Sequence, residues 1–322
     1  MNGSLEEETR RRFHGRREFL RTLAGLGVVP GALASLRAGP ADVLPNPVGY
    51  ATIAWPREEF AHALETISRL GFRGVQLLGW VREAYPATKA QELGQLLASL
   101  KLKPVALSCW AVQLAPERQG NETVEVRGYA EFFSRLGGMF LQVTDHGNPS
   151  KEYSAEDIST LGARMNALGK MAQDYGLTLG YHPHFGTIGE TRKGLGLVLE
   201  ATDPRRVKLI ADVAHLALGG SDPVEVIRTY GERLCFLHLK DLRKEIAAVA
   251  RQDRNLVVGK GPPFCEIGLG MVDFAAVVQA LRAVRFSGWV VVELDGGNST
   301  LGGPDASAAK NRAELRKLGF DV

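Results

Sequence analysis

The side chains best suited to chemistry stand at the ends of apolar runs along the sequence. Five of the seven histidines lie at or just after such ends. Four run ends combine histidine or lysine with acidic residues: Tyr181-His182-Pro183-His184, Asp212-Val213-Ala214-His215, His238-Leu239-Lys240-Asp241 and Glu293-Leu294-Asp295. Imidazole nitrogens with carboxylate oxygens suit Mn²⁺ or Co²⁺ first, and leave Zn²⁺, Fe²⁺ and Mg²⁺ open. We therefore expect a divalent metal ion held by His182, Asp212, His238 and Glu293.

Each of these residues, taken alone, has an ordinary structural explanation, because a polar side chain often caps the end of a strand. Their joint occurrence at four successive run ends argues against that explanation for the whole set. The residues must also meet in space if they are to share one ion. The arrangement of the runs decides whether they do.

The apolar runs alternate with amphipathic helical stretches, which is typical of βα units. The helical stretches include Arg57–Leu70, Thr88–Leu100 and Ser154–Tyr175. Eight expected strands are Val48–Trp55, Gly74–Trp80, Pro104–Trp110, Met139–Asp145, Leu177–His182, Val207–Val213, Leu234–Leu239 and Gly288–Glu293. The pattern predicts an α/β protein with a single (β/α)8 TIM barrel, whose strand ends converge on one rim. We expect Arg243–Gly270 to form an extended loop over that rim.

Residues 1–38 differ from the rest of the chain. The stretch Arg16-Arg17-Glu18-Phe19-Leu20-Arg21 precedes a mildly apolar segment, and Ala32-Leu33-Ala34 supplies small residues for cleavage. This pattern resembles a twin-arginine export signal. We therefore expect residues 1–38 to be a signal peptide and spacer, and residues 39–322 to be the barrel. The exported protein would be periplasmic or extracellular.

Charge and hydropathy indicate which classes of binding partner the protein can have. Residues 1–38 hold seven basic and four acidic side chains, which leaves 32 of each in the remainder. A formally neutral barrel gives no support for nucleic-acid binding. The barrel region contains no apolar run long enough for a membrane span. We expect a small-molecule sugar or keto-sugar substrate and no membrane contact after signal removal, while a homo-oligomer stays open.

Several motifs are similar to those of a known family. They are His238-Leu239-Lys240-Asp241, Asp212-x-x-His215 and Glu293 at the end of the eighth strand. On these residues the chain resembles the xylose isomerase-like TIM barrels, or sugar phosphate isomerase/epimerase superfamily. The resemblance covers about residues 48–318 and is closest to the inosose dehydratase branch. The branch motifs are Tyr181–Thr187 with Glu190, Gly288–Glu293 and Gly268-x-Gly270-x-x-Asp273-Phe274.

The resemblance implies a ligand set with one departure. Members of the superfamily usually have a metal-binding Glu at the end of strand five, an Asp on strand six, a His on strand seven and a Glu on strand eight. The last three are matched by Asp212, His238 and Glu293. At the strand-five position the chain has His182, or His184 in another register. Glu190 would replace either histidine if its loop folded back.

The resemblance also implies the class of reaction. In this superfamily a divalent ion holds a carbonyl and the adjacent hydroxyl of a sugar, and a base removes the α-proton to give an enediolate. Epimerisation typically uses two carboxylates on opposite faces of the sugar, and only Glu293 remains of that pair. Histidine near neutral pH can instead protonate a leaving oxygen. We expect a dehydratase or lyase acting on a keto-sugar, an inositol-derived ketone or a keto-glycoside.

Supporting residues are expected around the metal. Acid, base or hydrogen-bond donor roles are expected for His184, His215 and Lys240. Substrate contacts are expected from Trp55, Trp110, Asp145, His146 and Glu190. Core packing is the alternative for the tryptophans, and a surface position is the alternative for Lys240.

Other functions stay open at this point. One is a metal-dependent isomerase or epimerase of the same superfamily. Another is a non-catalytic exported barrel that binds carbohydrate, in which the lost strand-five Glu would reflect lost activity. An endonuclease-like barrel is disfavoured, because Gln76 and Ser108 stand where such sites need early-strand ligands.

The leader gives the first testable prediction. Changing Arg16-Arg17 to Lys-Lys should retain the protein in the cytoplasm, because the twin-arginine route depends on that pair. Cell fractionation and immunoblotting measure the outcome, with cleavage near Ala34 expected only in the wild type. Normal export of the variant would contradict the assignment.

Overall fold

The computed structural model describes residues 43–114, 119–147, 152–252 and 263–322. These segments all belong to the unit Asp42–Val322. The expected export signal, and its boundary with the barrel at residues 38 and 39, lie outside the described ranges.

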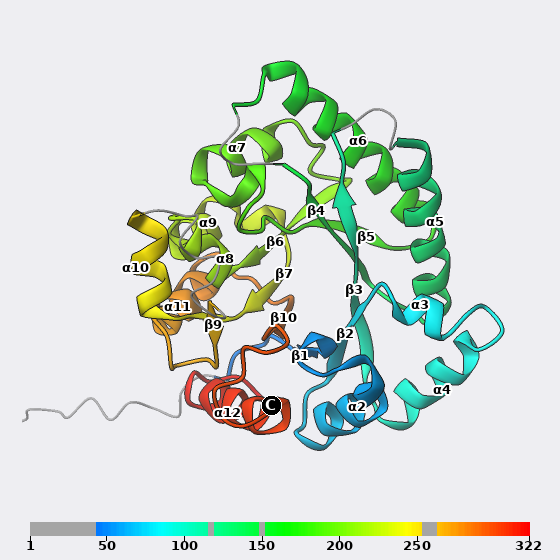
Figure 1. The fold of residues 1–322 in the computed structure, drawn as a ribbon, viewed down its shortest axis with the longest axis vertical. Coiled ribbons are helices and arrows are strands. Elements are labelled where there is room, and N and C mark those ends of the chain that lie inside the picture. Colours follow the sequence, from blue (N-terminus) through cyan, green and yellow to red (C-terminus); the bar gives the residue numbers. More distant parts are fainter. Residues whose placement is uncertain (1–42, 115–118, 148–151, 253–262) are drawn as a thin grey trace, which may run out of the picture. The chain divides into compact units, whose positions relative to one another are not determined.

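In the described residues, eight parallel strands form a closed barrel in the order β1-β10-β7-β6-β5-β4-β3-β2 (Figure 1). This confirms the predicted TIM barrel. The strands are β1 (Val48–Ala51), β2 (Gly74–Leu78), β3 (Lys103–Val112), β4 (Phe140–Asp145), β5 (Thr178–Tyr181), β6 (Val207–Asp212), β7 (Leu234–Leu239) and β10 (Trp289–Val292). Each predicted strand corresponds to an observed one, with ends that shift by a few residues.

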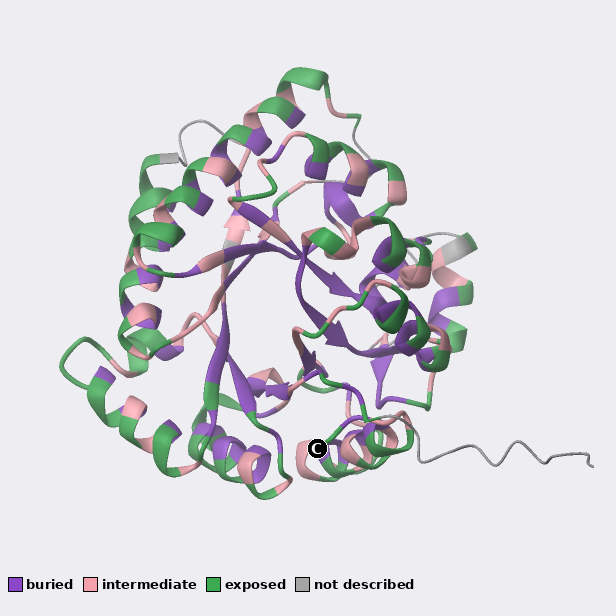
Figure 2. Cartoon of the chain, turned by 180° about the vertical axis from the view of Figure 1, so that it is seen from behind, coloured by how far each residue is buried: buried purple, intermediate pink, exposed green. Residues whose placement is uncertain are grey.

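Helices surround the barrel (Figure 1). The longer ones are α2 (Phe60–Arg69), α4 (Ala90–Ser99), α5 (Gln119–Arg135), α6 (Ala155–Asp174), α7 (Arg192–Glu200), α9 (Pro223–Tyr230), α11 (Phe274–Ala283) and α12 (Pro304–Lys317). Shorter ones are α3 (Val81–Ala84) and α8 (Val213–Leu218). Figure 2 shows their buried residues facing inward and their exposed residues facing outward. No helix among the described residues has the length and apolar character to cross a membrane.

Local sequence signals explain where several helices begin. Asp222 accepts a hydrogen bond from Val224 N and caps α9, and Asp273 caps α11 in the same way through Ala276 N. Aspartate is among the residues preferred at this position, because its carboxylate accepts hydrogen bonds from backbone N–H groups of the first turn. Ser154 and Asp157 form a reciprocal capping box at the start of α6. These caps satisfy backbone donors that a helix leaves unpaired at its first turn.

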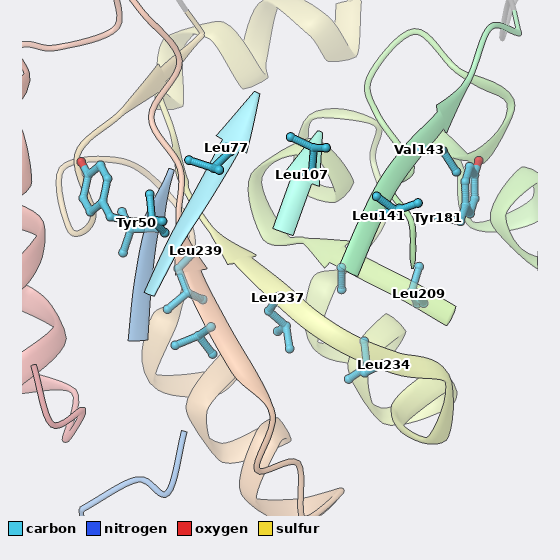
Figure 3. Packing of buried hydrophobic residues seen from close by; sticks show 14 of the residues in the cluster. Tyr50, Leu77, Leu107, Leu141, Val143, Tyr181, Leu209, Leu234, Leu237 and Leu239 are labelled. Carbon is cyan, nitrogen blue, oxygen red and sulfur yellow. The ribbon is translucent and has the colours of Figure 1, made fainter. Parts of the chain in front are cut away.

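The alternation of side chains along each strand divides the core into two layers. Leu237 and Leu239 of β7 belong to the large apolar cluster (Figure 3). The same cluster contains helix residues such as Leu64. Successive strand side chains point to opposite faces, so the residues between them face the barrel interior. The interior cluster contains Ala106, Ile210, Phe236 and Val291, all fully buried. It forms an apolar floor inside the barrel.

The segment after β7 differs from its expectation. Arg243–Gly270 was predicted to be an extended loop, yet its described part contains helix α10 (Lys244–Gln252). It also contains strand β9 (Phe264–Cys265), which pairs antiparallel with β8 (Asp241–Leu242). The amphipathic character of α10 explains the error, because Ile246 and Ala247 are buried against α8 and β8.

Asp241 holds this extension together. Its Oδ1 accepts hydrogen bonds from Leu242 N and Val272 N, and its Oδ2 accepts from Gly268 N and Gly270 N, all at 2.8–3.0 Å. A Cβ at Gly270 would lie 2.3 Å from Asp241 Oδ1, so this approach requires glycine. Asp241 therefore braces the backbone of this extension.

The packing of α6 against the connection to β6 gives a stability prediction. A Cβ at Gly169 would lie 2.4 Å from the carbonyl oxygen of Arg206. Gly169→Ala should lower the free energy of unfolding by about 1–3 kcal/mol, although alanine in a helix interior is normally favoured over glycine by about 1 kcal/mol. Urea unfolding followed by circular dichroism measures the change.

Gly94 in α4 is the matched control. A Cβ there would meet nothing closer than Leu136 Cδ2 at 3.8 Å. Gly94→Ala should therefore stabilise the protein by about 0.5–1 kcal/mol. Equal stabilisation by both substitutions would show that α6 does not pack as tightly as described.

Candidate active site

The alternation of side chains along each strand, which forms the apolar floor, also directs the polar strand-end residues into the barrel. Ile210, Phe236 and Val291 face the barrel interior. The residues two positions later therefore face inward one layer nearer the carboxyl ends of the strands: these are Asp212, His238 and Glu293. The strand register sets Asp212 directly beside His238. His182 follows the end of β5 and is also buried.

Three donor atoms meet in this layer. Asp212 Oδ2 lies 3.5 Å from His182 Nε2 and 3.5 Å from His238 Nδ1, and the two nitrogens are 3.4 Å apart. Two ligands about 2.1 Å from one ion, at tetrahedral angles, are separated by about 3.4 Å. The three atoms therefore have the spacing of ligands that share a divalent ion.

The two oxygens of Asp212 have different surroundings. Asp212 is the N-cap of α8, and its Oδ1 accepts from Ala214 N and His215 N at 2.9 and 3.0 Å. Its Oδ2 is buried and has no hydrogen-bond partner within the described part of the chain. A buried anionic oxygen is costly without a partner of opposite charge. A cation at this oxygen fits the donor set.

Lys240 brings a positive charge to the same space. Its Nζ lies 2.6 Å from Glu293 Oε1, 3.1 Å from Asp295 Oδ2 and 3.5 Å from Asp212 Oδ2. Burial alone would lower the pKa of Lys240, but these carboxylates outweigh burial and raise it above its usual value. Lys240 is therefore a buried ammonium group and not a surface lysine. Asp295 is a partner that the sequence analysis did not assign.

The carboxylates respond to the same charges. Burial would raise the pKa of Glu293, but His238 and Lys240 oppose it and lower that pKa to about 2. Burial would also raise the pKa of Asp212, yet the charge of Lys240 holds it well below its usual range. Both groups are therefore ionised at neutral pH.

Two glutamines lie beneath the ligands. His238 Nε2 is 2.7 Å from Gln76 Oε1, and Gln76 Nε2 donates to Glu293 Oε2 at 2.9 Å. Gln142 follows, with its Oε1 3.3 Å from Gln76 Nε2 and its Nε2 3.3 Å from His182 Nδ1. The sequence analysis gave these amides no role. The available signal was a polar residue with an apolar residue on each side within a strand.

The rings of His215 and His184 lie beside this layer and against each other, with their planes inclined by 38°. Their centroids are 3.7 Å apart, and His184 Nδ1 lies 2.7 Å from the carbonyl oxygen of Phe185. His215 Nε2 is 3.4 Å from Lys240 Nζ. Burial holds the pKa of His215 well below its usual value, so the ring is neutral at pH 7. The sequence-based expectation of an imidazole acid near neutral pH therefore does not fit His215.

Phe264 of β9 covers the two polar groups just described. Its ring lies 4.6 Å from Lys240 Nζ and 4.7 Å from the His215 ring. Phe264 N donates to Asn298 Oδ1 at 3.0 Å, which ties the cover to the chain after β10. The extension held by Asp241 thus closes one side of the site.

Two residues expected to bind substrate have structural tasks instead. Asp145 accepts hydrogen bonds from Tyr181 Oη, Gly147 N and Ile188 N, so its oxygens hold the loops after β4 and β5. Glu190 is buried in a short 3-10 helix and accepts from Gly186 N. Glu190 therefore braces the loop after β5, and it is not in either group of potential metal ligands found in the described part of the chain.

The other residues that were expected to contact substrate are Trp55, Trp110 and His146. Trp55 is buried in the core, packs edge-on against Tyr50 and donates to Asp305 Oδ1 at 2.8 Å, which supports the core-packing alternative. The side chain of Trp110 lies outside the described part of the chain. His146 is exposed just after β4, and its backbone N donates to Val112 O.

The comparisons with known proteins agree with this architecture. The family model described as "Xylose isomerase-like TIM barrel" matches residues 64–318. An inosose dehydratase from Geobacillus thermodenitrificans is 27% identical over 295 residues, which span 84% of this chain and 96% of that protein. The prediction of a dehydratase of this superfamily agrees with this relative.

Solved structures share the fold. The IOLI protein with a bound zinc atom superposes with a TM-score of 0.69 at 17% identity, covering 85% of this chain and 98% of that one. The probable 3-DHS dehydratase AsbF from Bacillus anthracis gives a TM-score of 0.67 at 17% identity, with the same coverages. At these identities the likeness concerns the fold alone.

The buried charges predict how stability depends on pH in metal-free protein. Burial lowers the pKa of His182 to about 4 from 6.5. The unfolded chain therefore binds the proton first as the pH falls, so stability present above about pH 6.5 is lost on the way to about pH 4. The shift corresponds to about 3 kcal/mol. The low pKa of Glu293 continues the loss below pH 4.5, towards about 2.

Urea unfolding at a series of pH values, with chelator present, measures this dependence. His182→Gln should make the curve less steep between neutral pH and about pH 4, because only one of the two buried histidines with a lowered pKa, His215, is then left to titrate. His146→Gln, at an exposed histidine, is the control and should keep the wild-type curve. A His182→Gln curve as steep as the wild type would rule out this origin.

Proposed function

The chain belongs to the xylose isomerase-like TIM barrel family, and from that premise we propose that it is a divalent-metal-dependent dehydratase or lyase. The proposed substrate is a keto-sugar, an inositol-derived ketone or a keto-glycoside. The observation that carries the proposal is the set of donor atoms Asp212 Oδ2, His182 Nε2 and His238 Nδ1, 3.4–3.5 Å apart at the carboxyl end of the barrel.

We propose His182, Asp212, His238 and Glu293 as the residues that hold the ion. Asp212, His238 and Glu293 also offer one ligand atom each within 4.8 Å of one another. Mn²⁺ or Co²⁺ suits this mixture of nitrogen and oxygen, and Zn²⁺ is supported by the zinc in the IOLI fold neighbour. When bound, the ion supplies positive charge that stabilises the carbonyl oxygen of the substrate.

Two side chains of the protein then carry out the two proton transfers of the elimination. His215 is neutral and buried, so we propose that it accepts the proton from the carbon beside the carbonyl. Lys240 is protonated, so it donates to the oxygen that departs from the next carbon as the C–O bond breaks. The two groups are 3.4 Å apart, which allows them to serve neighbouring carbons. His184, whose ring lies against that of His215, orients it.

Elimination is favoured over epimerisation by what surrounds Glu293. Its two oxygens already accept from Lys240 at 2.6 Å and from Gln76 at 2.9 Å. Epimerisation needs a second base on the opposite face of the sugar, and the strand-five position here holds His182. The inosose dehydratase relatives support the same choice.

Location is a separate proposal. We propose export by the twin-arginine route, on the basis of Arg16-Arg17 and the small residues Ala32-Leu33-Ala34. That route carries folded proteins, which suits an enzyme that acquires its metal in the cytosol.

His215→Gln tests the reaction. Turnover on inosose or a 3-keto-glycoside should fall by about 100- to 10,000-fold, the usual contribution of a general acid or base. Metal content, measured by elemental analysis, should stay at the wild-type level because the ligands are intact. Asp212→Ala is the contrasting variant and should lose both metal and turnover.

The product decides between reaction classes. Mass spectrometry should show loss of water or of the glycosidic alcohol, giving an unsaturated or diketo product. A product of unchanged mass that carries solvent deuterium at the α-carbon would mean isomerisation or epimerisation instead. Wild-type turnover by His215→Gln would remove that residue from the mechanism.

A further inference from the structure

We propose that Gln76 is a positioning residue that selects which nitrogen of His238 carries the proton. The other nitrogen, which faces the metal centre, is then free to bind the ion. The inference rests on the proposed function, because the ion is what the selected nitrogen serves. Gln76 is fully buried on β2, and its side chain touches both His238 and Glu293. It lies outside the ligand set itself.

The orientation of the Gln76 amide follows from its neighbours. Glu293 is an ionised carboxylate and can only accept hydrogen bonds, so the amide nitrogen must face it, at 2.9 Å. The same nitrogen lies 2.9 Å from Ser108 Oγ. The amide oxygen is therefore the atom that faces His238, and turning the amide would place two negative oxygens together.

This orientation determines the tautomer of His238. Gln76 Oε1 can only accept, so the proton of the neutral imidazole lies on Nε2, 2.7 Å away. The lone pair is then on Nδ1, which is 3.5 Å from Asp212 Oδ2 and 3.4 Å from His182 Nε2. The opposite tautomer would place a proton among these three donor atoms and block the ion. Gln76 thus keeps one face of the site open.

The backbone explains why Gln76 reaches this point. The pairing of β2 with β3 changes register between Val75 and Gln76, since Val75 pairs with Pro104 and Gln76 pairs with Ala106. Such irregularities re-aim side chains next to functional sites. Thr52 Oγ1 also donates to the carbonyl oxygen of Gln76 at 3.2 Å. A glutamate here would accept from His238 but repel Glu293, so an amide is the group that serves both.

The experiment uses the full chain labelled with ¹⁵N-histidine. Long-range ¹H–¹⁵N correlation spectra of metal-free protein report the tautomer of each histidine, and competition with a chromophoric chelator gives the Zn²⁺ affinity. In the wild type we expect His238 as the Nε2–H tautomer. Gln76→Met, of similar size without an acceptor, should lose that preference and bind Zn²⁺ about 10- to 100-fold more weakly.

Two variants separate this role from general disruption. Gln76→Glu keeps an acceptor for His238 and should keep the Nε2–H tautomer, which also provides a readout if Gln76→Met fails to fold. Ser108→Ala removes another partner of the same amide and should leave both the tautomer and the Zn²⁺ affinity unchanged.

The outcomes are distinguishable. If Gln76→Met keeps the Nε2–H tautomer of His238, or if Gln76→Glu loses it, the proposed role is overturned. A weaker Zn²⁺ affinity with no change of tautomer also overturns it, because a purely structural effect would then suffice. If the wild type binds no Zn²⁺, Mn²⁺ or Co²⁺, the metal-dependent function fails, while the tautomer still decides the role of Gln76.

Discussion

The site depends on holding several charges of one sign in a space largely closed to water. Asp212 and Glu293 are buried, and Asp295 is 28% exposed at the edge of the same space. Lys240 contacts all of them and neutralises one charge. In a medium of low polarity the remaining repulsion is strong. A divalent ion would balance the two negative charges left over. The donor atoms and the net charge of the site therefore both call for a divalent cation.

Much of the surrounding structure serves to keep this arrangement fixed. Asp241 holds the extension that places Phe264 over Lys240, so the ammonium group is shielded from solvent on that side. Gln76 satisfies the buried edges of His238 and Glu293 from below. Low polarity strengthens each of these hydrogen bonds, and it also raises the cost of losing one. The hydrogen-bond network therefore stabilises the site and also holds its side chains in one arrangement.

Several residues expected to contact substrate make other contacts in the structure, and the physical reason is the same for each. Asp145 and Glu190 are polar residues near strand ends, as ligands would be, but their oxygens accept hydrogen bonds from loop backbone. A strand-end position gives a residue access to the rim, whereas its rotamer and the path of the next loop decide what it contacts. Trp55 shows the same effect, because its ring turns into the core.

The sequence by itself determined the barrel and its active rim, because hydrophobic periodicity and strand order are local properties that a parallel barrel converts into one shared end. It also identified Asp212, His238 and Glu293 by their places on the strands. Only the tertiary structure decided which atoms converge and which are already engaged. Gln76 on β2 is far in sequence from His238 and Glu293, and Asp295, just after β10, is far in sequence from Lys240, so their roles arise from contacts that closure of the barrel creates.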